Sequence, residues 1–275
     1  MSERMSGMRR SLAPTTLLLL AAALGFPGGS DAAEPLEDAI RGTIRITEGG
    51  HSATAFVVDL GKAEEETRRY AIVASTRVFR ETEESICTLH FRVAHQESGY
   101  TRLNLGLRIR KGDEPLWVQH PTADVAAIFV DLPDVADVVP FKVEQIATEK
   151  FFDSKRIGVG QEVYIPCFPA KVESNDAGFP VLRKGSIASY PLNRPSVGDG
   201  ILIDYPYFGG DSGAPVTVIV DDRPIVIGVA VGMLRQVEEL ESEFEERTTH
   251  TPISLAGAAR SVLILETLDR LKKSE

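Results

Sequence analysis

Two series of short apolar segments, separated by glycine- and proline-bearing turns, most constrain how this 275-residue chain can fold. Several segments alternate between apolar and polar residues, which is the pattern of a half-buried β-strand. Short strands spaced about 8–12 residues apart are typical of sandwiches and barrels, so two series favour two barrels. The first series covers residues 43–47, 53–60, 70–76, 86–95, 101–111 and 116–132. The second covers residues 162–168, 180–190, 200–203, 214–220 and 224–231.

The two ends of the chain and the stretch between the series differ from this pattern. Residues 133–149 are less regular and are predicted to connect the two halves. Near the C-terminus, apolar residues recur at helical spacing and two lysines follow them, which favours a helix end. We therefore predict an all-β fold with one C-terminal α-helix. The expected parts are an N-terminal barrel at about 38–132, a C-terminal barrel at 150–253 and the helix at 254–273.

The N-terminus has the pattern of a secretory signal peptide. Arg9 and Arg10 precede an apolar run over residues 17–26, and the small residues Ser30 and Ala32 follow. A membrane-spanning helix needs about 20 apolar residues, roughly twice the length of this run. We predict a signal peptide over residues 1–32, a single domain over 33–275, and a secreted or periplasmic protein without a stable membrane span. An uncleaved membrane anchor is the alternative.

Composition excludes several classes of function. The net charge of −10 at pH 7 argues against a protein that binds nucleic acid or anionic membranes through a basic field. The two cysteines, Cys87 and Cys167, are too few for a disulfide scaffold or a structural zinc site. They either form one disulfide or remain as two separate buried thiols. We found no metal-ligand cluster or phosphate loop, so we predict no metal and no cofactor.

Residues 237–247 contain six glutamates. A run of like charges is usually a solvated loop or an exposed helix. A calcium site or a surface for a basic partner is the alternative.

The segment with the clearest chemistry is residues 208–216, Phe-Gly-Gly-Asp-Ser-Gly-Ala-Pro-Val. A serine between glycines can project its hydroxyl while neighbouring N–H groups converge on one point, where they can stabilise an oxyanion. A glycine-rich hairpin with an incidental serine is the simpler alternative. Upstream, Asp124 enters an apolar strand after a His-Pro turn, and residues 72–79 end another strand in a short polar turn.

In their order along the chain, residues 72–79, Asp124 and residues 208–216 resemble motifs of the chymotrypsin/trypsin-like serine peptidases, particularly the secreted bacterial branch. The resemblance covers about residues 41–271 and implies two antiparallel six-stranded β-barrels with a cleft between them. It places Ser212 at the nucleophile position and Asp124 at the position of the acid that orients the histidine. The N–H groups of Gly210 and Ser212 correspond to the oxyanion hole.

The resemblance fails at the histidine, because Arg77 stands directly before Val78 where the family has its general base. An arginine side chain stays protonated in proteins, so it cannot accept the serine proton. Loss of one triad member leaves only about 10³–10⁴-fold catalysis over water. We expect Arg77 to pair with Asp124 and predict that breaking the pair costs several kcal/mol. The remaining histidines are expected to be surface or structural residues: His51, His90, His95, His120 and His250.

The resemblance also locates the primary specificity pocket, between the Pro206 region and the strand at residues 228–232. The substrate-binding positions that it implies are Pro206, Val229, Val231 and Gly232. No acidic residue occupies the expected floor, so a lysine- or arginine-specific pocket is not expected.

The sequence leaves open the roles of three aromatic residues near the serine and the partner of Asp211. Tyr205, Tyr207 and Phe208 either narrow the pocket or pack in its wall. In zymogen-activated relatives, the acid equivalent to Asp211 pairs with a newly cut N-terminal amine. No activation sequence is evident in this chain, so the partner of Asp211 is left open.

Taken together, the residues favour a catalytically impaired peptidase homologue that binds a peptide or protein in the cleft between the barrels. An active serine hydrolase that uses Ser212 with a non-standard base is the alternative. The sequence predicts no oligomeric state.

Overall fold

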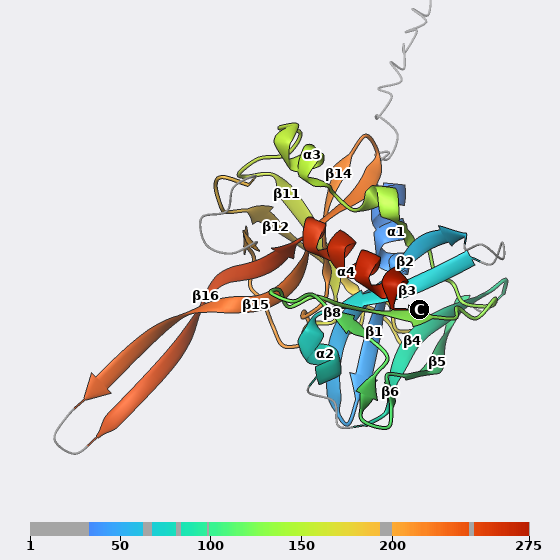
Figure 1. Cartoon of the computed structure of the whole chain (residues 1–275). Helices are drawn as coiled ribbons and strands as arrows, with labels where there is room; N and C mark the ends of the chain where they lie inside the picture. Colours follow the sequence, from blue (N-terminus) through green and yellow to red (C-terminus); the bar gives the residue numbers. More distant parts are fainter. Residues whose placement is uncertain are drawn as a thin grey trace, which may run out of the picture. The chain divides into compact units, whose positions relative to one another are not determined.

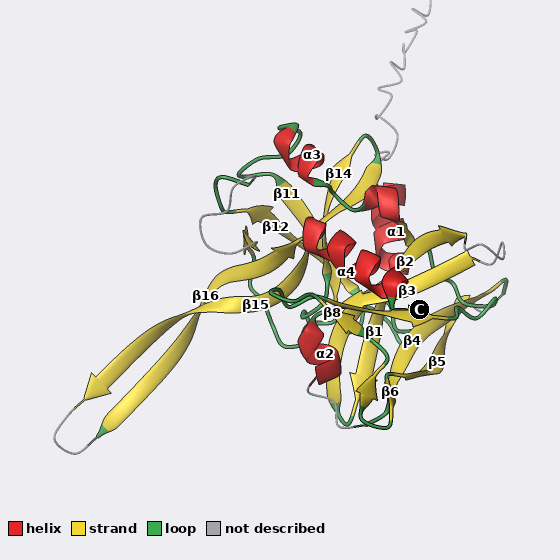
Figure 2. Cartoon of the chain, viewed as in Figure 1, coloured by secondary structure: helices red, strands yellow, loops and turns green. Residues whose placement is uncertain are grey.

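The computed structural model describes residues 33–62, 68–80, 84–97, 99–192, 200–241 and 245–274, which belong to one compact unit (Figure 1). The predicted signal peptide, residues 1–32, lies outside the described residues. Strands predominate over helices (Figure 2). None of the helices in the described ranges is long and apolar enough to cross a membrane.

The first half of the chain forms an eight-stranded sheet in the order β5-β4-β1-β2-β3-β9-β8, with β10 added in parallel to β2. Among the described residues its path does not return on itself, because β5 and β8 lie at its ends. The predicted closure of an N-terminal barrel is therefore not observed. The strands are β1 (Thr43–Glu48), β2 (His51–Lys62), β3 (Arg68–Ala74), β4 (Ile86–His95), β5 (Gly99–Arg108), β8 (Val118–Gln119), β9 (Ala126–Val130) and β10 (Phe141–Lys142). A separate short hairpin pairs β6 (Arg110–Lys111) with β7 (Glu114–Pro115).

The second half forms a closed barrel of six strands in the order β11-β12-β13-β16-β15-β14, which confirms one of the two predicted barrels. Inward-facing residues such as Ile165, Ile203 and Val216 make up its core. The strands are β11 (Glu162–Cys167), β12 (Val181–Ile187), β13 (Gly200–Asp204), β14 (Pro215–Val220), β15 (Arg223–Glu241) and β16 (Glu246–Arg260). Cys87 and Cys167 are buried free thiols in separate clusters, so the second of the two cysteine alternatives is correct.

Four α-helices and two short 3₁₀ turns complete the described chain. They are α1 (Ala33–Gly42), α2 (Thr76–Arg80), η1 (Val143–Gln145), α3 (Glu149–Asp153), η2 (Pro169–Lys171) and α4 (Ser261–Lys273). Three sequence predictions are corrected here. The described chain has three further α-helices besides the one predicted at the C-terminus. The expected polar turn after β3 is the helix α2, and the single strand predicted over residues 116–132 is divided into β8 and β9.

The C-terminal helix begins at Ser261, not at residue 254 as predicted. The preceding residues belong to β16, where Ala256 pairs with Ile203 and Ala258 with Ile201. Alanines favour a helix by propensity, but the barrel needs this strand for closure. The apolar residues at helical spacing form the buried face of α4, which packs against β9 and β15: Leu263, Ile264, Leu268 and Leu271.

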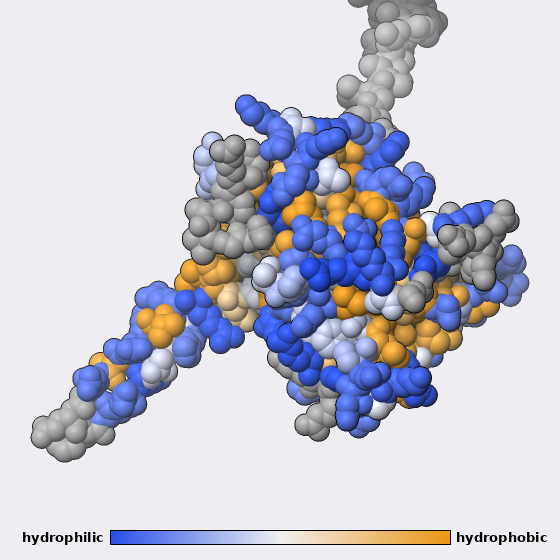
Figure 3. Space-filling model, in the orientation of Figure 1, coloured by the Kyte–Doolittle hydropathy of each residue, from blue (hydrophilic) through white to orange (hydrophobic). Residues whose placement is uncertain are grey.

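The glutamate-rich segment forms part of a long hairpin arm (residues 235–252), not the loop or helix that was predicted. β15 and β16 pair from Arg235↔Pro252 out to Glu241↔Glu246, and the described ranges place no third strand beside them. The arm leaves the barrel as a two-stranded ribbon with a largely hydrophilic surface (Figures 1 and 3). Glutamate is a poor strand former, but threonines, which favour strands, lie opposite Gln236, Glu238 and Glu239.

An arm of this kind should contribute little to the stability of the barrel, because a two-stranded hairpin in water is marginally stable. We predict that replacing residues 236–251 with Asn-Gly, a good two-residue turn between the paired Arg235 and Pro252, preserves the fold. Thermal unfolding followed by circular dichroism should give a melting temperature within about 4 °C of that of the intact chain. A much larger decrease would show that the arm supports the barrel.

Candidate active site

Ser212 lies in the loop between β13 and β14, and this loop is held from both halves of the chain. Thr54 of β2 donates its hydroxyl to the carbonyl of Gly210 at 2.7 Å, and its backbone N–H to the carbonyl of Ser212 at 3.0 Å. From β15, the carbonyl of Ala230 accepts the N–H of Gly213 at 2.8 Å. The serine is therefore fixed where the N-terminal sheet meets the barrel.

Two glycines make this loop possible. Gly210 and Gly213 have φ angles of +101° and +88°, a region that residues with a Cβ rarely adopt. A Cβ atom would lie 2.2 Å from the Phe168 carbonyl oxygen at Gly210, and 2.1 Å from the Thr54 carbonyl oxygen at Gly213. In the described part of the chain no acceptor takes the N–H of Gly210 or Ser212. Both donors therefore have no partner among the described residues.

Asp211 has its partner within the chain. Its side chain is fully buried, and its Oδ2 atom accepts hydrogen bonds from Arg183 Nη1 of β12 at 2.9 Å and from the Phe208 N–H at 2.8 Å. The Arg183 guanidinium also lies over the rings of Tyr205 and Phe208, at 5.0 and 5.2 Å. Burial raises the pKa of Asp211, and the Phe208 N–H and the Arg183 charge oppose that rise. The Asp211–Arg183 ion pair therefore links the serine loop to β12.

Arg77 and Asp124 form the ion pair that the sequence predicts. Arg77 Nε donates to Asp124 Oδ2 at 2.8 Å, and the Arg77 backbone N–H donates to Asp124 Oδ1 at 3.3 Å. However, 48% of the Arg77 side chain and 26% of the Asp124 side chain are exposed. Solvent screens such a pair, which is worth about 0–1 kcal/mol. The predicted cost of several kcal/mol assumed a buried pair and is therefore wrong.

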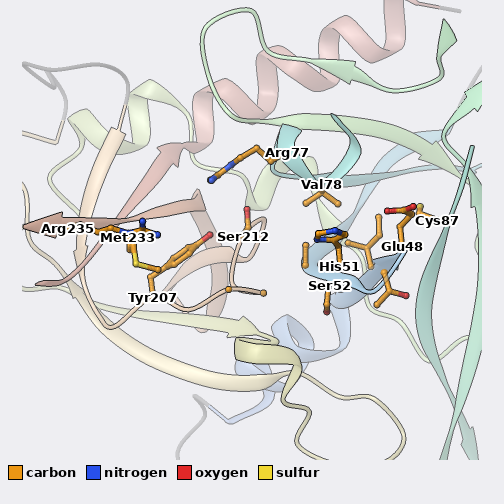
Figure 4. A pocket seen from close by; sticks show the side chains of 15 residues that line it. Glu48, His51, Ser52, Arg77, Val78, Cys87, Tyr207, Ser212, Met233 and Arg235 are labelled. Carbon is orange, nitrogen blue, oxygen red and sulfur yellow. The ribbon is translucent and has the colours of Figure 1, made fainter. Parts of the chain in front are cut away.

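The Arg77 side chain crosses from α2 toward β15. Its Nη2 atom lies 3.8 Å from the position that a Cβ atom would take on Gly232. Figure 4 shows the hydroxyl of Ser212 pointing to the side on which Arg77 lies. Neither Nη group of Arg77 hydrogen-bonds to another side chain or carbonyl in the described ranges. A cation with free donors therefore lies near the serine.

Tyr207 occupies the other side of Ser212. Its ring packs on the barrel core and contacts the ring of Tyr205 edge-to-face at 6.4 Å, while its hydroxyl points toward Ser212 (Figure 4). Burial raises the pKa of Tyr207 and outweighs the Ser212 hydroxyl and the Arg77 charge, which lower it. The phenol keeps its proton at neutral pH, so it cannot accept a proton from Ser212.

A cavity of about 280 Å³ opens beside Ser212. Three of the predicted site residues, Arg77, Gly210 and Ser212, line it. The rest of the lining comes from β1, β2, α2, β4, β15 and the serine loop: Ile46, Thr47, Glu48, His51, Ser52, Ala53, Val78, Cys87, Tyr207, Gly209, Met233 and Arg235. Apart from Arg77 and Val78, the contribution from the N-terminal half was not foreseen, because strand periodicity does not indicate which strand end borders a cavity.

The four predicted substrate-binding residues lie elsewhere. Val229 is buried in the cluster beneath α4, and Val231 packs against that cluster. Pro206 is exposed on the loop after β13, and Gly232 lies beside Arg77. None of the four lines the cavity at Ser212.

No histidine contacts Ser212 among the described residues. His51 lines the cavity, but it lies three residues before Thr54 on β2, about 10 Å along an extended strand. His90 bonds Thr47 and Asn104, His95 bonds Thr101, and His120 bonds Glu266 at 2.9 Å. His250 is on the arm. Within the described ranges, no group of three or more His, Cys, Asp or Glu side chains could hold a metal ion.

Comparisons with known proteins add little to this picture. No family model matches the sequence, and no curated protein matches it. One similar solved structure is that of Rv3671c from M. tuberculosis H37Rv, a serine-to-alanine mutant in an inactive form. It is 13% identical, and the match covers 87% of this chain and 91% of that chain with a TM-score of 0.49. The strand topology of the chain itself, and not this likeness, defines the fold.

The buried Asp211–Arg183 pair gives a direct test of how the serine loop is held. Changing Arg183 to Met leaves a buried carboxylate without its cation, which typically costs about 3–5 kcal/mol. We predict a decrease in melting temperature of more than about 6 °C at pH 7. The deficit should shrink as the pH falls, because burial raises the pKa of Asp211 and a protonated carboxyl no longer needs a cation.

The matched control is Arg156→Met, which removes an arginine whose pair with Asp221 is exposed at 43% and 76%. Its melting temperature should stay within about 4 °C of that of the wild type. Equal effects of the two substitutions would contradict an anchoring role for Arg183.

Proposed function

We propose that this protein is a trypsin-like serine peptidase homologue that has lost hydrolytic activity and binds a peptide or protein segment at the Ser212 loop. The observation that carries the proposal is the hydrogen bond from Arg77 Nε to Asp124 Oδ2. In a working triad, the acid holds a histidine that takes the serine proton. Here the acid holds an arginine, which has no lone pair to accept that proton.

The rest of the site favours binding without chemistry. The loop glycines and the two free N–H groups would still recognise a carbonyl or an anion, since they depend on the backbone alone. The candidate bases near Ser212 do not replace the histidine: Tyr207 keeps its proton, and His51 makes no hydrogen bond to Ser212 in the described chain. A serine hydroxyl without a base is a poor nucleophile at neutral pH.

The proposal includes a cellular setting and a domain organisation that rest on the sequence. A signal peptide over residues 1–32 would export a single domain over residues 33–275, which would act outside the cytoplasm. The eight-stranded sheet would correspond to the first barrel of the family, and the closed barrel to the second. The ligand would then lie between them, at the cavity beside Ser212.

A fluorophosphonate probe, which labels activated serines, tests the proposal. We predict that the wild type labels at least about 10³-fold more slowly than a working serine peptidase, because one triad member is missing. Arg77→His should increase the labelling, and the increase should follow deprotonation of an imidazole near pH 6–7. Ser212→Ala is the control for specific labelling. Rapid labelling of the wild type that disappears in Ser212→Ala would show an active hydrolase and overturn the proposal.

A further inference from the structure

We propose that the Ser212 loop and Arg77 together form a receptor for a carboxylate, and that the ligand is a peptide that ends in a free C-terminal carboxylate. This inference rests on the proposed function, because a hydrolase would release such an end as product. The proposal depends on three donors around one cavity: the N–H groups of Gly210 and Ser212, and the guanidinium of Arg77.

The guanidinium is only partly used by the protein. It has five N–H donors in a planar fork, and Asp124 takes the donor on Nε. The two Nη groups have no hydrogen-bond partner in the part of the chain that the structure describes. Nη2 extends as far as the edge of Gly232, where the absence of a side chain leaves it open. Arginine forks of this kind bind carboxylates with charge-assisted hydrogen bonds.

The loop supplies the complementary donors. The N–H groups of Gly210 and Ser212 have no acceptor among the described residues, although backbone donors next to buried structure generally need one. The Ser212 hydroxyl is also buried, and no partner among the described residues lies within hydrogen-bonding geometry of it. One carboxylate oxygen could accept from the loop while the second faces the Arg77 fork. Capture of a C-terminal carboxylate by backbone N–H groups is a recurrent mode of peptide recognition.

Arginine at position 77 changes which charge the site prefers. A neutral histidine beside two N–H groups suits an oxyanion that exists only during a reaction. A permanent cation in the same place stabilises an anion in the ground state, and a carboxylate carries that charge permanently. The substitution that removes the base therefore also creates the requirement for an anionic ligand.

The other charges around the cavity agree with this assignment. Arg235 of β15 lines the cavity on the Ser212 side, whereas Glu48 and His51 lie at the opposite side (Figure 4). Asp211 is fully buried and paired with Arg183, so its charge is already compensated. The remaining walls include Ile46, Ala53, Val78 and Met233, which suits a peptide with a small apolar C-terminal residue.

The test uses the full mature protein and two probes that differ only at the C-terminus: acetyl-Ala-Ala-Val with a free carboxylate, and the same peptide as its amide. In an NMR titration of ¹⁵N-labelled protein, the free acid should shift the amide signals of Gly210 and Ser212. The amide should bind about tenfold more weakly or worse, because it lacks the charge-assisted bonds. Arg77→Met should weaken binding of the acid by a similar factor and leave binding of the amide unchanged.

Arg80→Met is the matched control, since Arg80 lies on the same helix and bonds Gln119 away from the cavity. It should leave the affinity for both probes unchanged. Equal affinity for acid and amide, absence of acid binding at millimolar concentration, or full affinity in Arg77→Met would each overturn the carboxylate proposal. Rapid fluorophosphonate labelling of the wild type that disappears in Ser212→Ala would instead overturn the proposed function, so the two failures are distinguishable.

Discussion

One buried threonine connects the two halves of this molecule at the serine loop. Thr54 donates to the carbonyl of Gly210, accepts the Phe168 N–H at 3.2 Å, and donates its own backbone N–H to Ser212. The approach is so close that its carbonyl oxygen leaves no room for a Cβ on Gly213. The serine loop of the barrel therefore packs directly against β2 of the N-terminal sheet. The direction of the Ser212 side chain depends on this contact.

The serine loop and the Arg77–Asp124 pair are held by different contacts in this fold. The loop is held by Thr54, by its glycines and by the buried Asp211–Arg183 pair, none of which involves position 77. The exposed Arg77–Asp124 pair contributes little to stability. A substitution at position 77 can therefore leave the shape of the serine loop unchanged. Under the proposed function, this separation would let the loop bind a ligand while position 77 holds a residue that cannot accept a proton.

The sequence predicted the parts of the fold that depend on local pattern. The strand at residues 86–95 and the buried face of α4 were correct because alternation and helical spacing report directly on burial. The start of α4 was wrong because alanines 256, 258 and 259 favour a helix, yet β13 and β15 pair with them. The arm was missed because glutamates indicate solvent exposure but not backbone conformation. Strand pairing joins residues that are distant in sequence, so the pattern within one segment does not reveal its partners.

The sequence likewise predicted some features of the site and missed others. Ser212, Gly210 and the Arg77–Asp124 pair followed from motifs, whereas the Arg183 partner of Asp211 joins positions 28 residues apart and had no local signal. The position of Arg77 also depends on a distant residue. A Cβ atom on Gly232 would lie 3.8 Å from Nη2, at ordinary van der Waals contact. Arg77 at the start of α2 is therefore one part of this arrangement. The second part is Gly232 on β15, which leaves space beside the guanidinium, so a permanent positive charge lies on the side to which the Ser212 hydroxyl points.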